Sequence, residues 1–144
     1  MLEVKDKNIS AIKCINSVAV GNRIKALELE WSRYKYLVLE NSPAEYLQIR
    51  KLLKDKTSYP VFHFYRLVEE AMRTESTRGS SVNAMQHVWG YFKDVSTENE
   101  KSRFLRLTED FEKGKVKASS VKAFLYRMAV KYEEQYLLDS YYFI

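Results

Sequence analysis

The stretch from Asn22 to Asn41 reads NRIKALELEWSRYKYLVLEN and carries the clearest helical signal in the chain. Its apolar residues recur at spacings of three and four, which in an α-helix places them on one face. These residues are Ile24, Leu27, Trp31, Tyr34 and Val38. The stretch therefore predicts an amphipathic helix over residues 22–41, with Asn22 as its N-cap.

Signals for the start of a helix follow at intervals along the chain. In Ser42-Pro43-Ala44-Glu45, a serine N-cap precedes proline at the first helical position and glutamate at the third, as in a capping box. Pro60 is expected to open the next helix, and Thr97 with Glu100 forms a second capping-box pattern. These signals divide the chain into separate helices.

Glycine, serine and polar residues predict the remaining helix boundaries. Residues 74–81 are polar and contain Gly79, so we expect a loop there and a fourth helix over residues 82–92. Gly114 suits the residue after a helix, and Ser119 or Ser120 suits the N-cap of the last long helix. The aromatic end, residues 136–144, is expected to pack against the other helices.

Length and composition favour one helical domain. The chain has 144 residues, of which 46% are apolar and 30% charged, with only four Gly and two Pro. A chain of this size makes one domain, and the scarcity of turn residues disfavours a β-sandwich or barrel. We predict an all-α, single-domain bundle of five to six helices over residues 21–144, preceded by an N-terminal extension over residues 1–20.

Cysteine content and hydropathy predict a cytoplasmic protein. The single Cys14 cannot form an internal disulfide, and the charged start MLEVKDKNIS lacks the apolar core of a signal peptide. No apolar run is long enough to cross a membrane, so no membrane partner is expected. Nothing in the sequence fixes the oligomeric state.

Catalytic and metal-binding patterns are absent from the sequence. The histidines, His63 and His87, do not have the spacing of a zinc motif, and no nucleophile elbow or phosphate-binding glycine loop occurs. We therefore expect no catalytic residue, no metal site and no cofactor. An enzyme that uses His87 as a base would require a closed pocket with this residue at its floor.

The predicted fourth helix has a polar face opposite Trp89, made of Asn83, Gln86, His87, Gly90 and Asp94. This face has two interpretations, which are ordinary solvation of an amphipathic helix or contact with a ligand or RNA. Tyr36 and Tyr91 fall outside their apolar stripes and are expected to be exposed, as stacking on bases requires.

The net charge of +5 allows a polyanionic partner. Lys113-Gly114-Lys115-Val116-Lys117, called here the lysine loop, joins two predicted helices and could contact phosphates. Ordinary solubilisation by lysine is the other interpretation.

Several short sequence motifs, taken together and in order, resemble one family. They are Trp31…Lys35-Tyr36, Ser42-Pro43…Tyr46, Asn83…Gln86-His87…Gly90-Tyr91-Phe92-Lys93, Glu100-Lys101 and Tyr136-Leu137…Tyr141. In this order they resemble the YbgA-type domain, a bacterial family of unknown function, over about residues 22–142. The resemblance implies a cytoplasmic α-helical domain that occurs alone or fused to a cysteine-rich desulfidase domain acting on thiouracil or on thiouridine in tRNA. Because this chain has only Cys14, we do not extend desulfidase activity to it.

We therefore expect a non-catalytic accessory domain that binds structured RNA, with tRNA as the first candidate. The residues expected to contact RNA are Arg78, Asn83, His87, Tyr91, Lys93, Lys101, Lys113, Lys115 and Lys117. The alternative is a protein-interaction module that docks a separate desulfidase or another partner through the N-terminal extension or the aromatic C-terminal residues.

Overall fold

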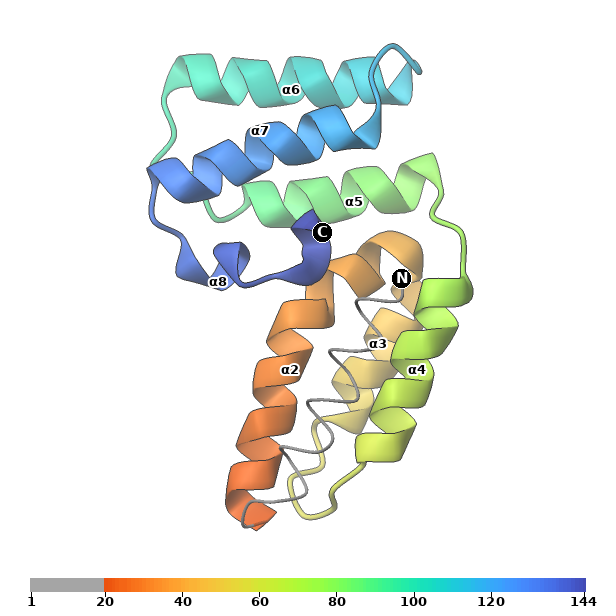
Figure 1. The fold of residues 1–144 in the computed structure, drawn as a ribbon. Coiled ribbons are helices and arrows are strands. Elements are labelled where there is room, and N and C mark those ends of the chain that lie inside the picture. Colours follow the sequence, from red (N-terminus) through yellow and green to blue (C-terminus); the bar gives the residue numbers. More distant parts are fainter. Residues whose placement is uncertain (1–19) are drawn as a thin grey trace.

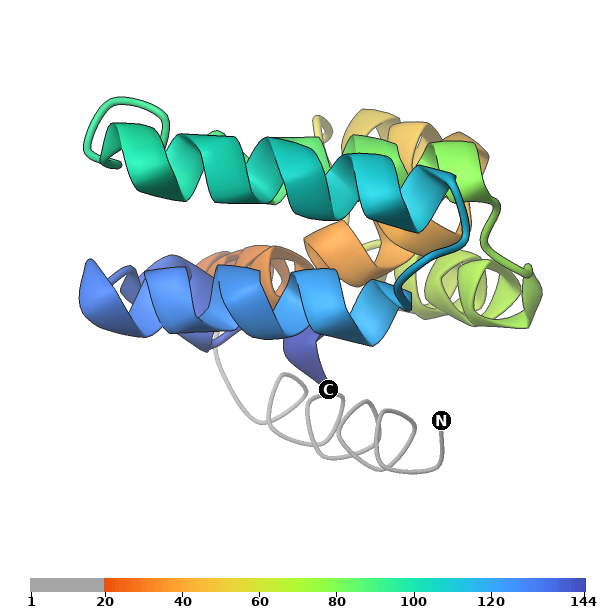
Figure 2. The same ribbon diagram turned by 90° about the horizontal axis from the view of Figure 1, so that it is seen from above.

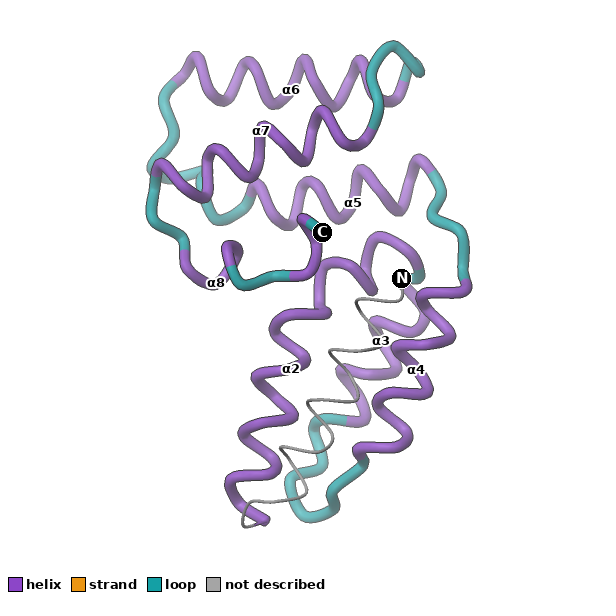
Figure 3. The backbone as a smooth tube through the Cα atoms, in the orientation of Figure 1, coloured by secondary structure: helices purple, strands orange, loops and turns teal. Residues whose placement is uncertain are grey.

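The computed structural model describes residues 20–144, and within them it contains helices and no strand (Figure 3). The elements are α2 (Val20–Asn41), α3 (Pro43–Leu52), α4 (Val61–Arg73), α5 (Arg78–Trp89), α6 (Glu98–Glu112), α7 (Ala118–Lys131), α8 (Gln135–Leu138) and the 3-10 helix η1 (Tyr141–Phe143). The predicted single-domain, all-α bundle is confirmed, and α8 adds one short helix to the six longer ones. Residues 1–19 of the predicted extension lie outside the described residues.

The longer helices form two groups of three. Figure 1 shows α5, α6 and α7 stacked on one another, with α2, α3 and α4 crossing beneath them. The C-terminal part of α2 reaches up against α5, which is the main contact between the groups. Seen from above, α6 and α7 run side by side (Figure 2). None of these helices is both long and apolar enough to span a bilayer.

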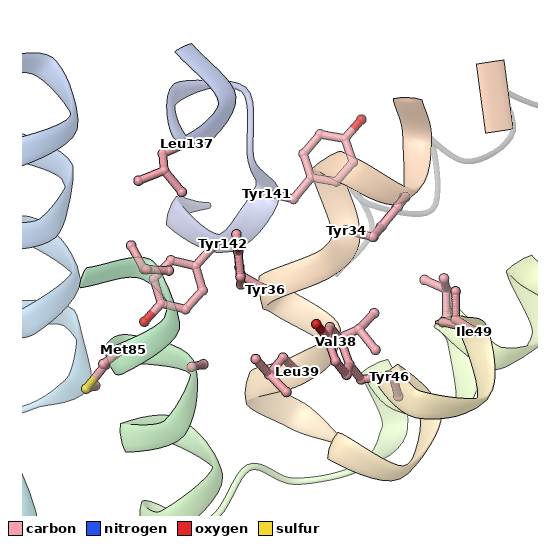
Figure 4. Close-up of a cluster of buried hydrophobic side chains, with 14 of the residues drawn as sticks. Tyr34, Tyr36, Val38, Leu39, Tyr46, Ile49, Met85, Leu137, Tyr141 and Tyr142 are labelled. Atoms are coloured by element: carbon pink, nitrogen blue, oxygen red, sulfur yellow. The ribbon is translucent and has the colours of Figure 1, made fainter. Parts of the chain in front are cut away.

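The core contains several buried tyrosines, and Figure 4 shows part of it. Tyr34 on α2 packs edge-to-face on Tyr141 of η1, with ring centroids 4.7 Å apart. Tyr142 is fully buried, and Lys122 of α7 lies over its ring and bonds to both its carbonyl oxygen and the Glu40 carboxylate. Tyr141 and Tyr142 of the aromatic C-terminal end therefore pack into the core, as predicted, whereas Tyr136 and Ile144 are exposed.

Several helix boundaries follow the predicted caps. Thr97 and Glu100 form the reciprocal capping box at the start of α6, and Gly114 has the positive φ of 74° expected just beyond its end. Ser42 caps α3 by accepting the N–H of Glu45. Glu45 does not return this bond to the backbone, because the Ser42 N–H already donates to the Val38 carbonyl oxygen at the end of α2.

Four predicted boundaries were wrong. The helix α2 already begins at Val20, so Asn22 lies inside it and is not its N-cap. The helix α5 ends at Trp89, three residues before the predicted end at residue 92. The polar segment before Val82 is not all loop, because Thr77 and Ser80 form a capping box that starts α5 at Arg78. Gly79 lies in the first turn of that helix. The last long helix begins at Ala118 after Lys117, without a side-chain cap, so neither Ser119 nor Ser120 is its N-cap.

Candidate nucleic-acid interface

Arg78 and the lysine loop come together in the fold. The Arg78 guanidinium donates from Nη1 to the Glu112 carbonyl oxygen at the end of α6, at 3.1 Å. A Cβ built on Gly114 would lie 3.2 Å from Arg78 Nη2, so the arginine packs closely against the loop. The first residue of α5 and the segment after α6 therefore form one positively charged surface.

The cations of this surface differ in how they are paired. The Lys113 ammonium lies 2.6 Å from the Glu109 carboxylate, which raises the pKa of the lysine and lowers that of the glutamate. Lys115 and Lys117 are exposed and form no ion pair within the described part of the chain. These two lysines are the cations most available to an anionic partner.

A shallow hollow of about 250 Å³ adjoins this surface between α5 and the end of α6. Arg78, Asn83 and Gln86 line it on the α5 side, and Glu112 on the other. Asn83 also lines a second hollow of about 430 Å³, formed with the starts of α3 and α5. Asn83 thus lines both hollows, and in the first of them it lies near Arg78, whose guanidinium packs on the lysine loop.

His87 lies further along the same polar face and is exposed. This exposure is inconsistent with a closed pocket that has His87 at its floor, the arrangement that the enzyme interpretation requires. Among the described residues, no group of three His, Cys, Asp or Glu side chains is placed to hold a metal ion.

Lys93 and Lys101 lie at the other end of α6 from the lysine loop. Lys93 is exposed in the turn after α5, whereas Lys101 is half-buried and lies 3.6 Å from the Glu98 carboxylate. Because α6 has 15 residues, the two ends are about 22 Å apart. The predicted cations therefore form two separate clusters, which only an extended partner could contact together.

The prediction of exposed tyrosines is wrong for Tyr36, which is 4% exposed. Tyr36 and the half-buried Tyr91 share a hydroxyl–hydroxyl hydrogen bond of 2.8 Å, and burial raises the pKa of both. The Tyr91 ring also stacks on Tyr136 of α8 at 5.8 Å. Tyr91 thus belongs to a packed tyrosine cluster, with one ring face already covered.

A further cationic site was missed by the sequence analysis. Arg103 of α6 and Arg127 and Lys131 of α7 line a hollow of about 330 Å³, called here the α6–α7 hollow. Its lining also includes Asn99, Glu100, Phe124 and Met128. The charge count of the sequence includes these basic residues, but no local motif shows that two helices bring them together.

Glu100 is tightly bound at the edge of this hollow. Its carboxylate accepts the Thr97 backbone N–H at 2.9 Å and the Tyr132 hydroxyl at 2.6 Å, and it pairs with Lys131 at 2.9 Å. The backbone bond, followed by the tyrosine and lysine bonds, lowers the pKa of Glu100 to about 2. The negative charge of Glu100 is therefore already stabilised by the Thr97 N–H, the Tyr132 hydroxyl and the Lys131 ammonium.

Comparison with known proteins gives a family and one informative relative. A family model described as a protein of unknown function (DUF1722) matches residues 35–144. The UV DNA damage endonuclease of Clostridium perfringens (strain 13 / Type A) is 31% identical over 121 residues. That match covers 81% of this chain but only 28% of the relative. No solved structure matches the chain.

Proposed function

The chain belongs to the DUF1722 family of proteins of unknown function, and we propose that it is a non-catalytic helical domain that binds structured RNA. The observation that supports this most strongly is the surface where Arg78, which shares a hollow with Asn83, packs on the lysine loop. We propose tRNA as the first RNA ligand to test. The link to thiouridine or thiouracil metabolism rests on the YbgA-type resemblance.

The chemistry of this surface suits an RNA backbone. Lys115 and Lys117 can act as point charges for phosphates, which fix the position of the nucleic acid. Asn83 and the exposed His87 can hydrogen-bond to riboses or base edges along α5. A partner that also reached Lys93 and Lys101 would have to follow α6 along its length.

DNA is the second candidate partner, because the relative from Clostridium perfringens is named for action on UV-damaged DNA. This chain spans little more than a quarter of that relative, so we propose an accessory role beside a catalytic part and no endonuclease activity. The same phosphate contacts would serve either nucleic acid, and direct competition between them distinguishes the two.

The docking alternative keeps two candidate surfaces, the N-terminal residues and the exposed part of the C-terminal end, where Tyr136 and Ile144 are 37% and 57% exposed. Tyr141 and Tyr142 are buried, so these two residues do not form the apolar docking surface considered from the sequence. If residues 1–19 dock a separate protein, removing them should abolish its capture while leaving RNA affinity unchanged.

Fluorescence anisotropy tests RNA binding with tRNA, intact and UV-irradiated duplex DNA, and heparin at low and moderate salt. The proposal expects tRNA to bind more tightly than the other three polyanions and to remain bound at about 150 mM salt. Equal, weak and salt-sensitive binding to all of them would contradict it. Preference for either duplex over tRNA would favour the DNA candidate.

A pair of matched variants tests the surface itself. Lys115→Gln with Lys117→Gln should weaken tRNA binding and reduce its salt slope by roughly 1–2. Lys51→Gln with Lys54→Gln removes the same charge from exposed positions in and just after α3, and should have little effect. Equal losses in both would assign binding to net charge alone. Lys93→Ala with Lys101→Ala then tests whether RNA reaches the other end of α6.

A further inference from the structure

The α6–α7 hollow gathers basic side chains from two helices. Residues near the start of α6 and the end of α7 line it together, as expected for antiparallel neighbours joined by a short loop. Arg103 comes from α6, whereas Arg127 and Lys131 lie one turn apart on α7. The hollow thus has basic groups on both sides.

These charges are only partly neutralised. Lys131 pairs with Glu100, whose carboxylate is also held by the Thr97 N–H and the Tyr132 hydroxyl. Arg103 and Arg127 form no ion pair with any carboxylate of the described residues. The lining therefore has a formal charge of +2, from three basic groups and one acid.

Aromatic packing supports Arg103. Its guanidinium carbon lies 5.6 Å from the centroid of the Phe124 ring. Phe124 in turn packs against Trp89 with nearly parallel rings, and Trp89 stacks on Phe104 at 4.6 Å. A guanidinium lying over an aromatic ring keeps the N–H groups on its edge available to an anion.

We propose that the α6–α7 hollow binds one phosphate group, held by Arg103 and Arg127 with Lys131 at its rim. Guanidinium groups match phosphate oxygens with paired hydrogen bonds, and a phosphate monoester carries about −1.5 to −2 charge at neutral pH. That charge balances the +2 of the lining better than a single carboxylate would. The phosphate can belong to a small molecule or to the end of a nucleic acid strand, so this site does not depend on the proposed RNA function.

Nuclear magnetic resonance can test the site directly. Inorganic phosphate and adenosine 5′-monophosphate are titrated into the ¹⁵N-labelled protein while the arginine Nε–Hε signals are followed. The signals of Arg103 and Arg127 should shift and saturate, whereas that of the exposed Arg106 should not. Acetate at the same concentration serves as the carboxylate control and should bind more weakly.

Variants then locate the binding energy. Arg103→Gln with Arg127→Gln should weaken phosphate binding at least about tenfold, because it removes two charged hydrogen-bonding groups. Arg66→Gln with Arg106→Gln removes two exposed arginines outside the hollow and should change affinity less than about twofold. Equal losses in both variants, or unsaturable shifts over the whole surface, would overturn the proposal.

The source of the phosphate is tested with oligonucleotides. A strand with a 5′-phosphate that binds more tightly than its 5′-hydroxyl twin, with the preference lost in the Arg103/Arg127 variant, indicates a nucleic acid end. Saturation by phosphate or adenosine 5′-monophosphate without any strand preference indicates a small molecule. If tRNA fails to bind at the lysine loop but phosphate still saturates the hollow, only the RNA function is contradicted.

Discussion

The hydroxyl groups of Tyr36 and Tyr91 lie 2.8 Å apart, in a hydrogen bond that joins α2 to the turn after α5. Tyr36 is 4% exposed, so its hydroxyl has little access to water. The bond connects the two groups of helices at the tyrosine cluster. Tyr91 is also one of the residues expected to contact RNA. Variants of this hydroxyl pair can therefore be compared for protein stability and for RNA affinity.

Replacing Tyr91 by Phe should lower the free energy of unfolding by about 1–2 kcal/mol, because the buried Tyr36 hydroxyl loses its partner. Tyr36→Phe with Tyr91→Phe should be closer to the wild type, since neither hydroxyl then remains unpaired. Urea unfolding measures the two single variants, Tyr36→Phe and Tyr91→Phe, and the double variant. A double variant that loses the sum of the two single changes would show that the hydroxyl pair contributes no coupling.

Lys122→Met should be among the most destabilising substitutions of a lysine in this chain. Its ammonium lies 2.7 Å from the Glu40 carboxylate, whose side chain is only 8% exposed. Without the lysine, Glu40 is a buried charge without this partner, at a cost of about 3 kcal/mol. Thermal and urea unfolding should show this loss, and adding Glu40→Gln should restore part of it. Lys54→Met, at an exposed position, is the control and should change stability by less than about 0.5 kcal/mol.

Gly114→Ala should cost about 1–2 kcal/mol, because φ is 74° at this position and left-handed backbone is unfavourable for alanine. The new methyl group would also lie 3.2 Å from Arg78 Nη2, so the guanidinium would have to shift slightly. Gly79→Ala is the matched control, because its Cβ would meet no heavy atom closer than 3.8 Å. Calorimetry should show a lower melting temperature for Gly114→Ala alone, and equal values would contradict the prediction.

Glu100→Gln should change how the free energy of unfolding depends on pH below neutrality. The folded protein lowers the pKa of Glu100 from 4.5 to about 2, so the ionised carboxylate stabilises the fold at higher pH. This contribution is complete above pH 4.5 and disappears as the pH falls toward 2. The stability difference between wild type and variant should therefore be largest near neutral pH and shrink in acid. Glu98→Gln, whose side chain is 90% exposed, should show no such convergence.

Local sequence signals predicted most helices because caps and periodicity act within a few residues. The start of α5 was predicted wrongly because Gly79 and its polar neighbours have the composition of a loop, although Thr77 and Ser80 form a capping box. The surface sites were harder to predict, since Arg78 reaches the end of α6 only through the fold. Arg103 and Arg127, which lie on different helices, likewise line one hollow only because the fold brings them together. Tyr36 lies outside the apolar stripe of α2, and periodicity alone did not show that a second face of this helix is buried.

The two tryptophans lie in different groups of helices. Trp31 packs on Tyr46 and Phe64 between α2, α3 and α4, whereas Trp89 packs against Phe104 and Phe124 with nearly parallel rings. Each half of the molecule thus has its own intrinsic fluorophore. The emission of Trp31→Phe and Trp89→Phe proteins would follow one half at a time, and coincident denaturation curves would mean that both halves melt as one cooperative unit.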